Sequence, residues 1–598
     1  MENQKYNINQ YSIETILAWI KSDEIAIPEI QRPFVWKSSK VRDLMDSLYN
    51  GYPVGYLIAW RNPDVKLKDG STSLGKKILI DGQQRITALN AAVLSDYIVD
   101  KEYRKRKIII AFQPLEEKFE VSTPAIAKDG NWLPDVSYII NGSLADLNKM
   151  VNKYCADNQA DADLMFQRLD KLRDIKNTRL GLIELDANLD IETVTEIFIR
   201  INSEGVVLSQ ADFVMSKIAA NERYDGTNLR KAIDYFCHLA VAPEFFPELK
   251  ENDSDFTQTD YFQKMSWLKK ETDDLYDPNY TDLIRVAFTS EFERGRLADL
   301  VSLLSGRNFE TRTFEEEIAE DSFNKLSAGV LKAMNENNFK RFLMIINSAG
   351  FIASRMIRSM NAIDFAYILY LKLKSLGYAA NEIERYVRRW YVMSVLTGRY
   401  SGSPESQFDF DIKQIANRDF GSYLKVVEDS ELSDAFWDVG LIQSLQTSFS
   451  SSPYFNVYLA SQVRNNDKGF LSREITVKDL ITHRGDIHHV FPRKYLKRFG
   501  LTRGKYNQIA NYVYMQSEIN IRIGSKPPNK YFSEIREQVN GGELKYGGID
   551  TQNLLTRNLN ANCIPHGIYN MTIENYESFL EQRREFMAKK IKKYYFSL

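Results

Sequence analysis

The sequence predicts a multidomain α+β protein, and three observations lead to this fold class. The chain has 598 residues, whereas a single hydrophobic core stops growing at roughly 250–300 residues, so about three domains are expected. Short β-forming runs alternate with helical patterns in the first part of the chain, and a mixed pattern returns in the last part. The middle is helical almost throughout. We therefore expect an α/β domain over 1–222, a helical region over 223–450 and a second mixed domain over 451–598.

The composition is that of a soluble globular protein, with 44% hydrophobic and 26% charged residues. The N-terminus lacks the basic and apolar regions of a signal peptide, and no apolar run approaches the roughly 18 residues that span a bilayer. The three cysteines, Cys155, Cys237 and Cys563, lie far apart in the sequence. This spacing excludes a CxxC-type zinc site and argues against a disulfide framework. We expect a cytoplasmic protein with no membrane partner.

The N-terminal domain is expected to alternate short strands with amphipathic helices. Apolar residues at three- and four-residue spacing indicate the helices, and runs rich in Ile, Leu and Val indicate the strands. The expected strands cover 56–60, 77–80, 107–112 and 180–185, and the expected helices cover 38–49 and 85–95.

The rest of the chain is expected to be mainly helical. The segment 361–376 has few polar residues and predicts a buried helix. The stretch 398–406, GRYSGSPES, is expected to be a turn between helices, and 448–453, SFSSSP, is typical of a linker. A final helix is expected over 574–595, and it ends in the basic run Lys589–Lys593, KKIKK.

Three of the five histidines in the chain, His483, His488 and His489, lie within seven residues of one another. Histidine suits the activation of water near neutral pH, which the hydrolysis of a phosphodiester requires together with a cation and a fixed scaffold. A histidine pair alone is also compatible with surface residues or a capped turn. Two further observations, downstream asparagines and a local positive charge, favour a catalytic site.

The asparagines are Asn511 and Asn520, nine residues apart. The Asn520 side chain offers a hard carbonyl oxygen, which suits Mg²⁺ or Mn²⁺ rather than zinc. The segment 482–537 contains eleven Lys and Arg against four Asp and Glu, a net charge of +7. A positive field of this size is what a phosphate backbone requires, although a solvated surface can have the same composition.

The arrangement Asp486-x-His488-His489-x-Phe-Pro, followed by the two asparagines, resembles the ββα-metal (HNH) nucleases. It is most similar to the C-terminal domain of the GmrSD family of modification-dependent (type IV) restriction endonucleases. The resemblance implies that His489 is the general base and that His488 and Asn520 are metal ligands. It implies that Asn511 holds the loop and orients the base. Asp486 and His483 have less defined parts, and Lys526 either contacts phosphate or is solvated.

Three polar motifs lie in the first 220 residues. They are Ile27–Trp36, which contains Gln31 and Arg32; Ile78–Leu89, which contains Asp81-Gly82-Gln83-Gln84-Arg85; and Phe198–Leu208, which contains Arg200 and Asn202. In the second motif a strand is expected to end at Asp81-Gly82 and a helix to start near Gln83. A helix N-terminus attracts anions, and Arg85 adds a donor for phosphate. A capped turn with an arginine salt bridge is the structural alternative.

Together these motifs resemble the N-terminal domain of the GmrSD family, which has a ParB/sulfiredoxin-like fold. The resemblance implies that Gln31, Arg32, Asp81, Gly82, Gln83, Gln84 and Arg85 bind a nucleotide, ATP or GTP, and take part in its hydrolysis. Arg200 and Asn202 are further candidates, and Asp81 is a candidate ligand for a Mg²⁺ that accompanies the phosphates. The sequence contains no Walker A motif, so an NTPase of the P-loop class is excluded.

The combined resemblance implies a single-chain, modification-dependent DNA endonuclease of bacterial antiphage defence, regulated by nucleotide and acting on modified phage DNA. A homodimer would favour double-strand cutting, because one HNH site cuts one strand at a time. Two alternatives stay open. One is a nucleotide-gated DNA-binding protein whose HNH domain is inactive. The other is an abortive-infection nuclease toxin that acts on RNA or host DNA.

Overall fold

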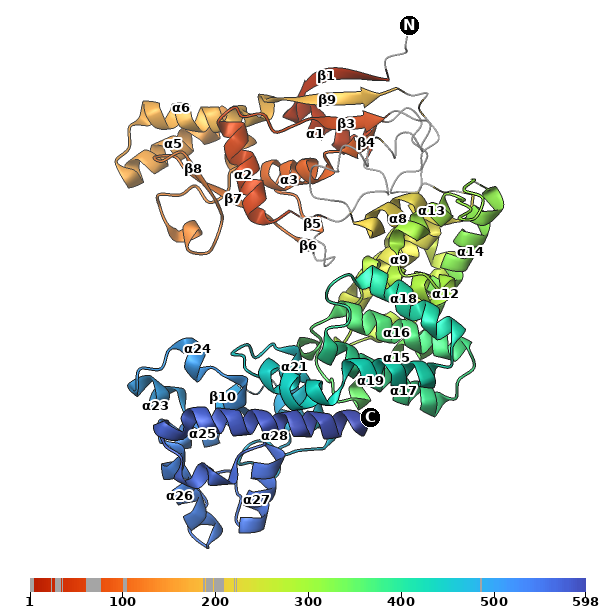
Figure 1. Ribbon diagram of the computed structural model, residues 1–598. Coiled ribbons are helices and arrows are strands. Elements are labelled where there is room, and N and C mark those ends of the chain that lie inside the picture. The colour runs from red at the N-terminus through yellow and green to blue at the C-terminus, as the bar shows by residue number, and fades with distance from the viewer. Residues whose placement is uncertain are drawn as a thin grey trace. The chain divides into compact units, whose positions relative to one another are not determined.

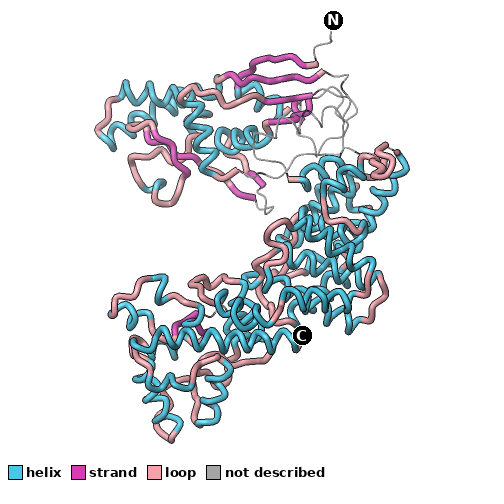
Figure 2. Tube along the Cα trace, in the orientation of Figure 1, coloured by secondary structure: helices cyan, strands magenta, loops and turns pink. Residues whose placement is uncertain are grey.

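A computed structural model of the protein describes residues 5–22, 24–26, 34, 36–60, 77–99, 105–186, 189, 197, 209–219, 221, 223–313, 315–483, 485 and 487–598. The chain divides into two compact units, Met1–Lys231 and Ala232–Leu598 (Figures 1 and 2). Each unit has a hydrophobic core of its own. Among the described residues, no helix combines the length and the apolar character needed to cross a membrane.

The first unit is built on a five-stranded mixed sheet with the strand order β1-β9-β3-β4-β2. The pairs β1–β9 and β3–β4 are antiparallel, whereas β9–β3 and β4–β2 are parallel. This sheet confirms the expected mixed α/β character of the N-terminal part. The strands are β1 Tyr6–Ser12, β2 Ile25–Ala26, β3 Leu57–Trp60, β4 Lys77–Asp81 and β9 Arg179–Leu185.

Two expected elements of this unit are compared with the observed ones here. The helical pattern over 85–95 belongs to α3 Gln83–Val93, whose N-cap is Gly82, so the helix begins at Gln83 as the strand-to-helix motif predicts. The strand expected over 107–112 is β7 Ile110–Gln113, which forms a separate hairpin with β8 Lys118–Val121 and stays outside the main sheet. Periodicity predicts a strand but not its partner. The remaining helices include α1 Ile13–Lys21, α2 Ser38–Tyr49, α5 Leu144–Asn158, α6 Ala162–Arg173 and α8 Gln210–Ala219.

The first half of the second unit is a helical assembly around α16 Met360–Ser375. Every residue of α16 from Ala362 to Leu373 is buried, which confirms the helix expected from its apolar sequence. It packs against α12 and α17. The boundary between the two units lies within α9 Gly226–Val241. The other helices of this half include α12 Tyr280–Phe292, α14 Glu316–Ala333, α15 Glu336–Ser348, α17 Ala380–Thr397, α18 Pro404–Asn417 and α19 Phe420–Glu431.

The second half of this unit contains one small antiparallel pair of strands, β10 Ile487–His489 and β11 Tyr512–Tyr514. The helix α25 Ser517–Ile523 follows β11 directly. The long C-terminal helix α28 Tyr576–Phe596 packs against α21 Pro453–Arg464 and also contacts α17. The other helices are α20 Leu441–Ser444, α22 Val477–Thr482, α23 Arg493–Arg498, α24 Arg503–Tyr506, α26 Pro528–Val539 and α27 Gln552–Ala561.

The segment 448–453, expected to be a linker, lies inside the second unit. It connects α20 to α21, and the carbonyl of Ser448 accepts a hydrogen bond from the Tyr512 hydroxyl at 3.1 Å. This contact ties the start of α21 to β11. The helical half and the C-terminal half of the unit are therefore packed together at this point.

Candidate functional site

The strand pair β10–β11 positions the two neighbouring histidines. His488 lies opposite Val513 and His489 lies opposite Tyr512 in the antiparallel register. Adjacent side chains of a strand point to opposite faces, so the two imidazoles cannot share one role at this position. Both residues are partly buried. The geometry therefore supports two different functions for His488 and His489.

His489 has a defined hydrogen-bond partner, Asn507. The His489 Nε2 atom lies 3.0 Å from Asn507 Oδ1. Because an amide oxygen only accepts, this contact places the imidazole hydrogen on Nε2 and leaves Nδ1 as the proton acceptor. The Tyr512 ring packs edge-on against the imidazole, with 5.2 Å between the ring centroids. The sequence indicated a catalytic histidine but gave no sign of Asn507, because a single asparagine in a loop has no motif.

The environment of His489 favours its neutral form. Burial lowers the pKa of His489 below its ordinary value of 6.5, the hydrogen bond to Asn507 opposes this shift, and the positive charge of Arg493 and the neighbouring His488 lower the pKa further. A neutral imidazole with an available lone pair is the form that a general base requires.

Asn511 holds the loop that carries this site. Its side chain is fully buried and accepts a hydrogen bond from the backbone N–H of Phe491 at 2.8 Å. The amide nitrogen donates to the carbonyl oxygens of Phe491 and Tyr506 at 3.1 and 3.2 Å. Asn511 thus joins the end of β10 to the segment before β11. The contact to the imidazole of His489 comes from Asn507, four residues earlier.

The C-terminal helix α28 completes this scaffold, which the sequence motif did not reveal. Arg583 is fully buried and donates to the Ala510 carbonyl at 2.8 Å, while the Tyr576 hydroxyl donates to the Lys505 carbonyl at 3.0 Å. A buried guanidinium needs several acceptors, and Arg583 also donates to the Asn562 carbonyl. No local pattern predicts the contacts to the Lys505 and Ala510 carbonyls, because more than sixty residues of sequence separate the partners.

A basic surface adjoins the histidines. The stretch from Ile487 to Ser517 contains no acidic residue. Its cationic side chains lie on or beside α23 and α24, and all are exposed: Arg493, Lys494, Lys497, Arg498, Arg503 and Lys505. We call these six residues the α23–α24 basic surface. Exposed cations without local acids are suited to bind the phosphates of a nucleic acid.

The remaining candidates of the C-terminal motif are placed as follows. Asn520 lies on α25 and is partly buried. The Lys526 side chain is 40% exposed and forms an ion pair, because its ammonium group donates to both carboxylate oxygens of Glu534, at 2.8 and 2.7 Å, and to the Tyr546 hydroxyl at 2.9 Å. His483 is exposed at the C-terminal end of α22. Asp486 lies outside the described residues.

Among the described residues, no group of three or more His, Cys, Asp or Glu side chains is placed to hold a metal ion. The metal ligands expected here, His488 and Asn520, are one histidine and one amide. They come from β10 and α25, and α25 directly follows β11, the strand that pairs with β10. An amide oxygen and an imidazole can serve a divalent cation whose other positions are filled by water or phosphate.

In the first unit, β4, Gly82 and α3 form the expected strand-to-helix turn. Asp81 is the last residue of β4, Gly82 is the N-cap with φ +99°, and Gln83 starts α3. A Cβ added at Gly82 would lie 2.3 Å from the Leu57 Cδ2 atom. Only glycine therefore fits this position, both for its backbone angle and for the close approach of β3. The turn presents the first N–H groups of α3 beside Asp81.

Arg85 is folded back onto the chain next to this turn. One of its terminal nitrogens donates to the Tyr56 carbonyl at 2.8 Å, and the guanidinium lies 3.0 Å from where a Cβ on Gly55 would be. Burial lowers the pKa of Arg85, and the charge of Asp81 opposes this shift. Arg85 thus ties the first turn of α3 to the entry of β3.

Four other N-terminal candidates lie outside the described residues: Gln31, Arg32, Arg200 and Asn202. Gln83 and Gln84 occupy the first turn of α3 and are partly buried. The described part of the N-terminal candidate site is therefore Asp81 to Arg85.

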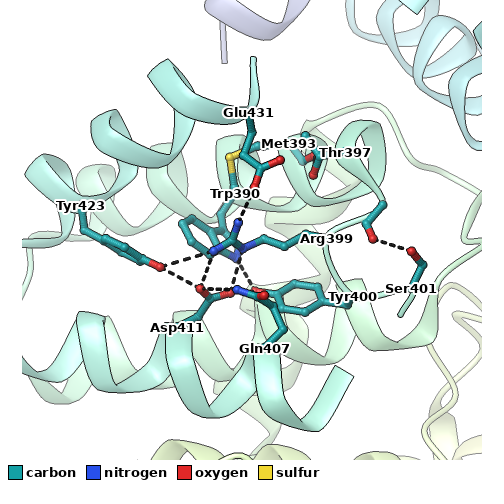
Figure 3. A network of polar contacts seen from close by, with 11 residues as sticks. Trp390, Met393, Thr397, Arg399, Tyr400, Ser401, Gln407, Asp411, Tyr423 and Glu431 are labelled. Atoms are coloured by element: carbon teal, nitrogen blue, oxygen red, sulfur yellow. Dashed lines mark hydrogen bonds and ion pairs between the residues drawn. The ribbon is translucent and has the colours of Figure 1, made fainter. Parts of the chain in front are cut away.

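The stretch 398–406 is a turn between helices, as expected, and it also carries a buried polar network (Figure 3). The Arg399 guanidinium donates to both carboxylate oxygens of Asp411, at 2.8 and 2.6 Å. Asp411 is fully buried and also accepts from the hydroxyls of Tyr400 and Tyr423, at 2.8 and 2.7 Å. These donors compensate the charge of the buried carboxylate. The network also joins the turn after α17 to α18 and α19.

Part of the chain is similar to a restriction endonuclease domain. Residues 13–219 match the family model of the GmrSD restriction endonuclease N-terminal domain. An uncharacterized protein of Methanocaldococcus jannaschii is 22% identical over 552 residues, which cover 86% of this chain and 85% of that protein. The family match covers the strand-to-helix turn at Gly82. The relative is similar over most of the length, including the region of the second unit.

Proposed function

We propose that this protein is a modification-dependent DNA endonuclease of antiphage defence, with an HNH-type site around His488 and His489 and a nucleotide-regulated N-terminal domain. The observation that carries the nuclease assignment is the hydrogen bond between His489 and Asn507. It leaves Nδ1 of a neutral, partly buried imidazole as the proton acceptor beside the α23–α24 basic surface. The match of residues 13–219 to a restriction endonuclease domain supports the same conclusion.

The proposed chemistry begins with His489, whose Nδ1 takes a proton from the attacking water. Asn507 keeps the hydrogen on Nε2 and so fixes the tautomer that this step requires. The α23–α24 basic surface positions the phosphate backbone. His488 and Asn520 would hold one Mg²⁺ or Mn²⁺, which when bound stabilises the charge that develops on the phosphoryl and leaving oxygens.

The N-terminal domain is proposed to bind ATP or GTP at the turn from Asp81 to Arg85. The free N–H groups at the start of α3 favour an anionic ligand, and Gly82 gives the turn the left-handed backbone angle from which α3 starts. Arg85 is already bonded to the Tyr56 carbonyl. In our proposal this contact is exchanged for the phosphates, which couples nucleotide binding to the entry of β3.

The test is the cleavage of modified and unmodified phage DNA by the full-length protein with Mg²⁺, with ATP, GTP or no nucleotide. We expect His489→Ala to abolish cleavage. His483→Ala is the matched control, because His483 is an exposed histidine of the same segment and should be dispensable. If His489→Ala cuts like the wild-type protein, the nuclease assignment is wrong.

Arg85→Ala tests the N-terminal assignment in the same experiment. It should leave the cutting chemistry intact and remove the difference between reactions with and without nucleotide. An unchanged nucleotide dependence would refute the role of Arg85. Two other results would select the alternative functions: DNA binding without turnover indicates an inactive HNH domain, and cleavage of RNA or host DNA that depends on His489 indicates a toxin.

A further inference from the structure

A second basic site lies at the C-terminal end of α28, where the run Lys589–Lys593 is found. This run is not part of the proposed nuclease site. A pocket of about 580 Å³ opens beside it, between α28, the segment after α21 and the segment that joins α27 to the short helix His566–Asn570. The volume falls in the range of ordinary ligand sites, roughly 300–1,000 Å³. The chain thus has a concave surface beside the basic end of α28.

Three lysines of α28 line this pocket against one acidic residue. Lys590 is bound to Asp467 in an ion pair of 2.5 Å and also donates to the Ala561 carbonyl at 2.8 Å. Both side chains of this pair are largely buried, with 14% and 12% exposed. Asp467 is the only acid among the lining residues, and Lys590 neutralises it. The charge of the other two lysines is therefore not compensated within the pocket.

Those two lysines, Lys589 and Lys593, are one helical turn apart and both are exposed. Residues at this spacing lie on the same face of a helix with their Cβ atoms about 6 Å apart, so both ammonium groups can reach one anionic ligand. The ion-pair contacts of the described residues include neither of them. Neutral hydrogen-bonding side chains complete the rim, from Asn465, Asn560 and His566, and all three are exposed.

We propose that this pocket is a phosphate-binding site, distinct from the nuclease site and from the strand-to-helix turn of the first unit. Lys589 and Lys593 neutralise the phosphate charge, and the amide and imidazole groups of the rim donate hydrogen bonds to its oxygens. The Lys590–Asp467 pair forms the rigid wall against which the ligand sits. The phosphates belong either to a small polyphosphate or to a nucleic acid backbone, and both present the same chemistry.

An alternative explanation for lysines at this position is their attraction to the C-terminal end of the helix dipole, which requires no ligand. The helix itself offers a control that separates the two explanations. Lys592 belongs to the same run but does not line the pocket, and it lies 3.5 Å from the exposed Asp434. Removing the charge of Lys592 alters the net charge of the protein and the interaction with the helix dipole as much as removing the charge of Lys589 or of Lys593.

The experiment measures the binding of inorganic pyrophosphate by calorimetry and of a short DNA duplex by fluorescence anisotropy. It uses the full-length protein at low salt with EDTA, so that nothing is cleaved. We expect the double variant Lys589→Gln, Lys593→Gln to lose at least about tenfold in affinity for pyrophosphate. Lys592→Gln should bind like the wild-type protein, and the charge-preserving variant Lys589→Arg, Lys593→Arg should retain binding.

The duplex distinguishes the two sources of phosphate. If the site contacts a nucleic acid backbone, the double variant should also reduce the slope of log affinity against log salt by about two, one for each lost phosphate contact. An unchanged duplex affinity assigns the site to small polyphosphates. The proposal is overturned if the double variant binds both probes like Lys592→Gln, or if the wild-type protein does not bind pyrophosphate. No outcome depends on cleavage, so failure of the nuclease assignment gives a different result.

Discussion

At the scale of single residues, the candidate nuclease site depends on two asparagines with separate tasks. Asn507 contacts the imidazole of His489, whereas Asn511 makes hydrogen bonds to backbone groups of the loop. The first affects the protonation and the tautomer of the base, and the second affects the stability of the loop. Substitutions at the two positions should therefore have different consequences.

Substitution of Asn507 should change the pH dependence of cleavage. Because the folded protein holds the pKa of His489 below 6.5, activity should persist below that pH and be lost as the pH falls through the lowered pKa. Asn507→Asp places a negative charge beside the imidazole, raises its pKa and moves the acid limb of the rate profile to higher pH. Asn507→Ala removes a contact that raises the pKa, so the limb should move to lower pH while the maximal rate falls by about tenfold or more.

The measurement is the single-turnover rate of cleavage against pH at saturating Mg²⁺. Gln508→Ala is the control, because Gln508 is adjacent but donates to the Gly504 carbonyl rather than to the imidazole. A purely structural role for Asn507 would lower the rate equally at every pH. Shifts of the acid limb in the same direction for Asp and Ala would contradict the assignment.

Substitution of Asn511 should act on stability rather than on the pH profile. Asn511→Ala leaves the buried N–H of Phe491 without its acceptor and removes one donor from each of the Phe491 and Tyr506 carbonyls. We expect a loss of about 2–4 kcal/mol in the free energy of unfolding, measured by denaturant titration of the second unit's transition. Asn520→Ala, at a partly buried position on α25, should cost less than about 1 kcal/mol. Equal costs for the two variants would show that Asn511 does not hold the loop.

At the scale of elements, the turn between α17 and α18 is fixed by charge as well as by packing. Arg399 lies between the Asp411 carboxylate and the Trp390 ring, and its guanidinium carbon is 5.3 Å from the ring centroid. The side chains of Arg399 and Asp411 are only 7% and 0% exposed. A pair buried to this degree is costly to break, because removal of Asp411 leaves Arg399 with only the more exposed Glu431, 3.2 Å away, as an ionic partner.

Asp411→Asn should therefore destabilise the second unit by about 3–5 kcal/mol. Arg399→Lys should not preserve stability, since a single ammonium group cannot replace the two-pronged contact to the carboxylate. The matched control is Arg341→Ala, which breaks an exposed ion pair with Glu384 and should cost about 0–1 kcal/mol. Urea unfolding followed by tryptophan fluorescence measures all three. A cost at Asp411 no greater than at Arg341 would show that the network does not stabilise this turn.

At the scale of the whole molecule, the chain consists of two units with separate cores. Each contains one position where a small substitution should be destabilising. Gly82→Ala introduces a Cβ at a left-handed position, 2.3 Å from Leu57, in the first unit. Asp411→Asn breaks the buried network of the second.

In differential scanning calorimetry, Gly82→Ala should lower the transition of the first unit by a few degrees or more and leave the other transition in place. Asp411→Asn should have the opposite pattern. Gly130→Ala is the control for the first variant, because no neighbouring atom lies within 4 Å of the added Cβ. If each variant shifts both transitions equally, the two units unfold as one.

The sequence by itself predicted the strands around β3, β4 and β9, the helices α2 and α16, and the position of the final helix. These elements depend on local periodicity, which a single segment contains in full. It also predicted the strand-to-helix turn at Gly82 and indicated the resemblance to GmrSD enzymes, because both depend on short contiguous motifs. The assignment of His489 as the base and of His488 and Asn520 as metal ligands stays a prediction.

The tertiary structure decided which groups meet. It brought Asn507 to His489, Arg583 to the Ala510 carbonyl and Lys526 to Glu534, and it joined Arg399 to Asp411 across the turn. These contacts link residues of different secondary-structure elements or of the loops between them, so no local pattern contains them. Which side chains form such hydrogen bonds depends on how whole elements pack against one another, and this packing exists only in the folded chain.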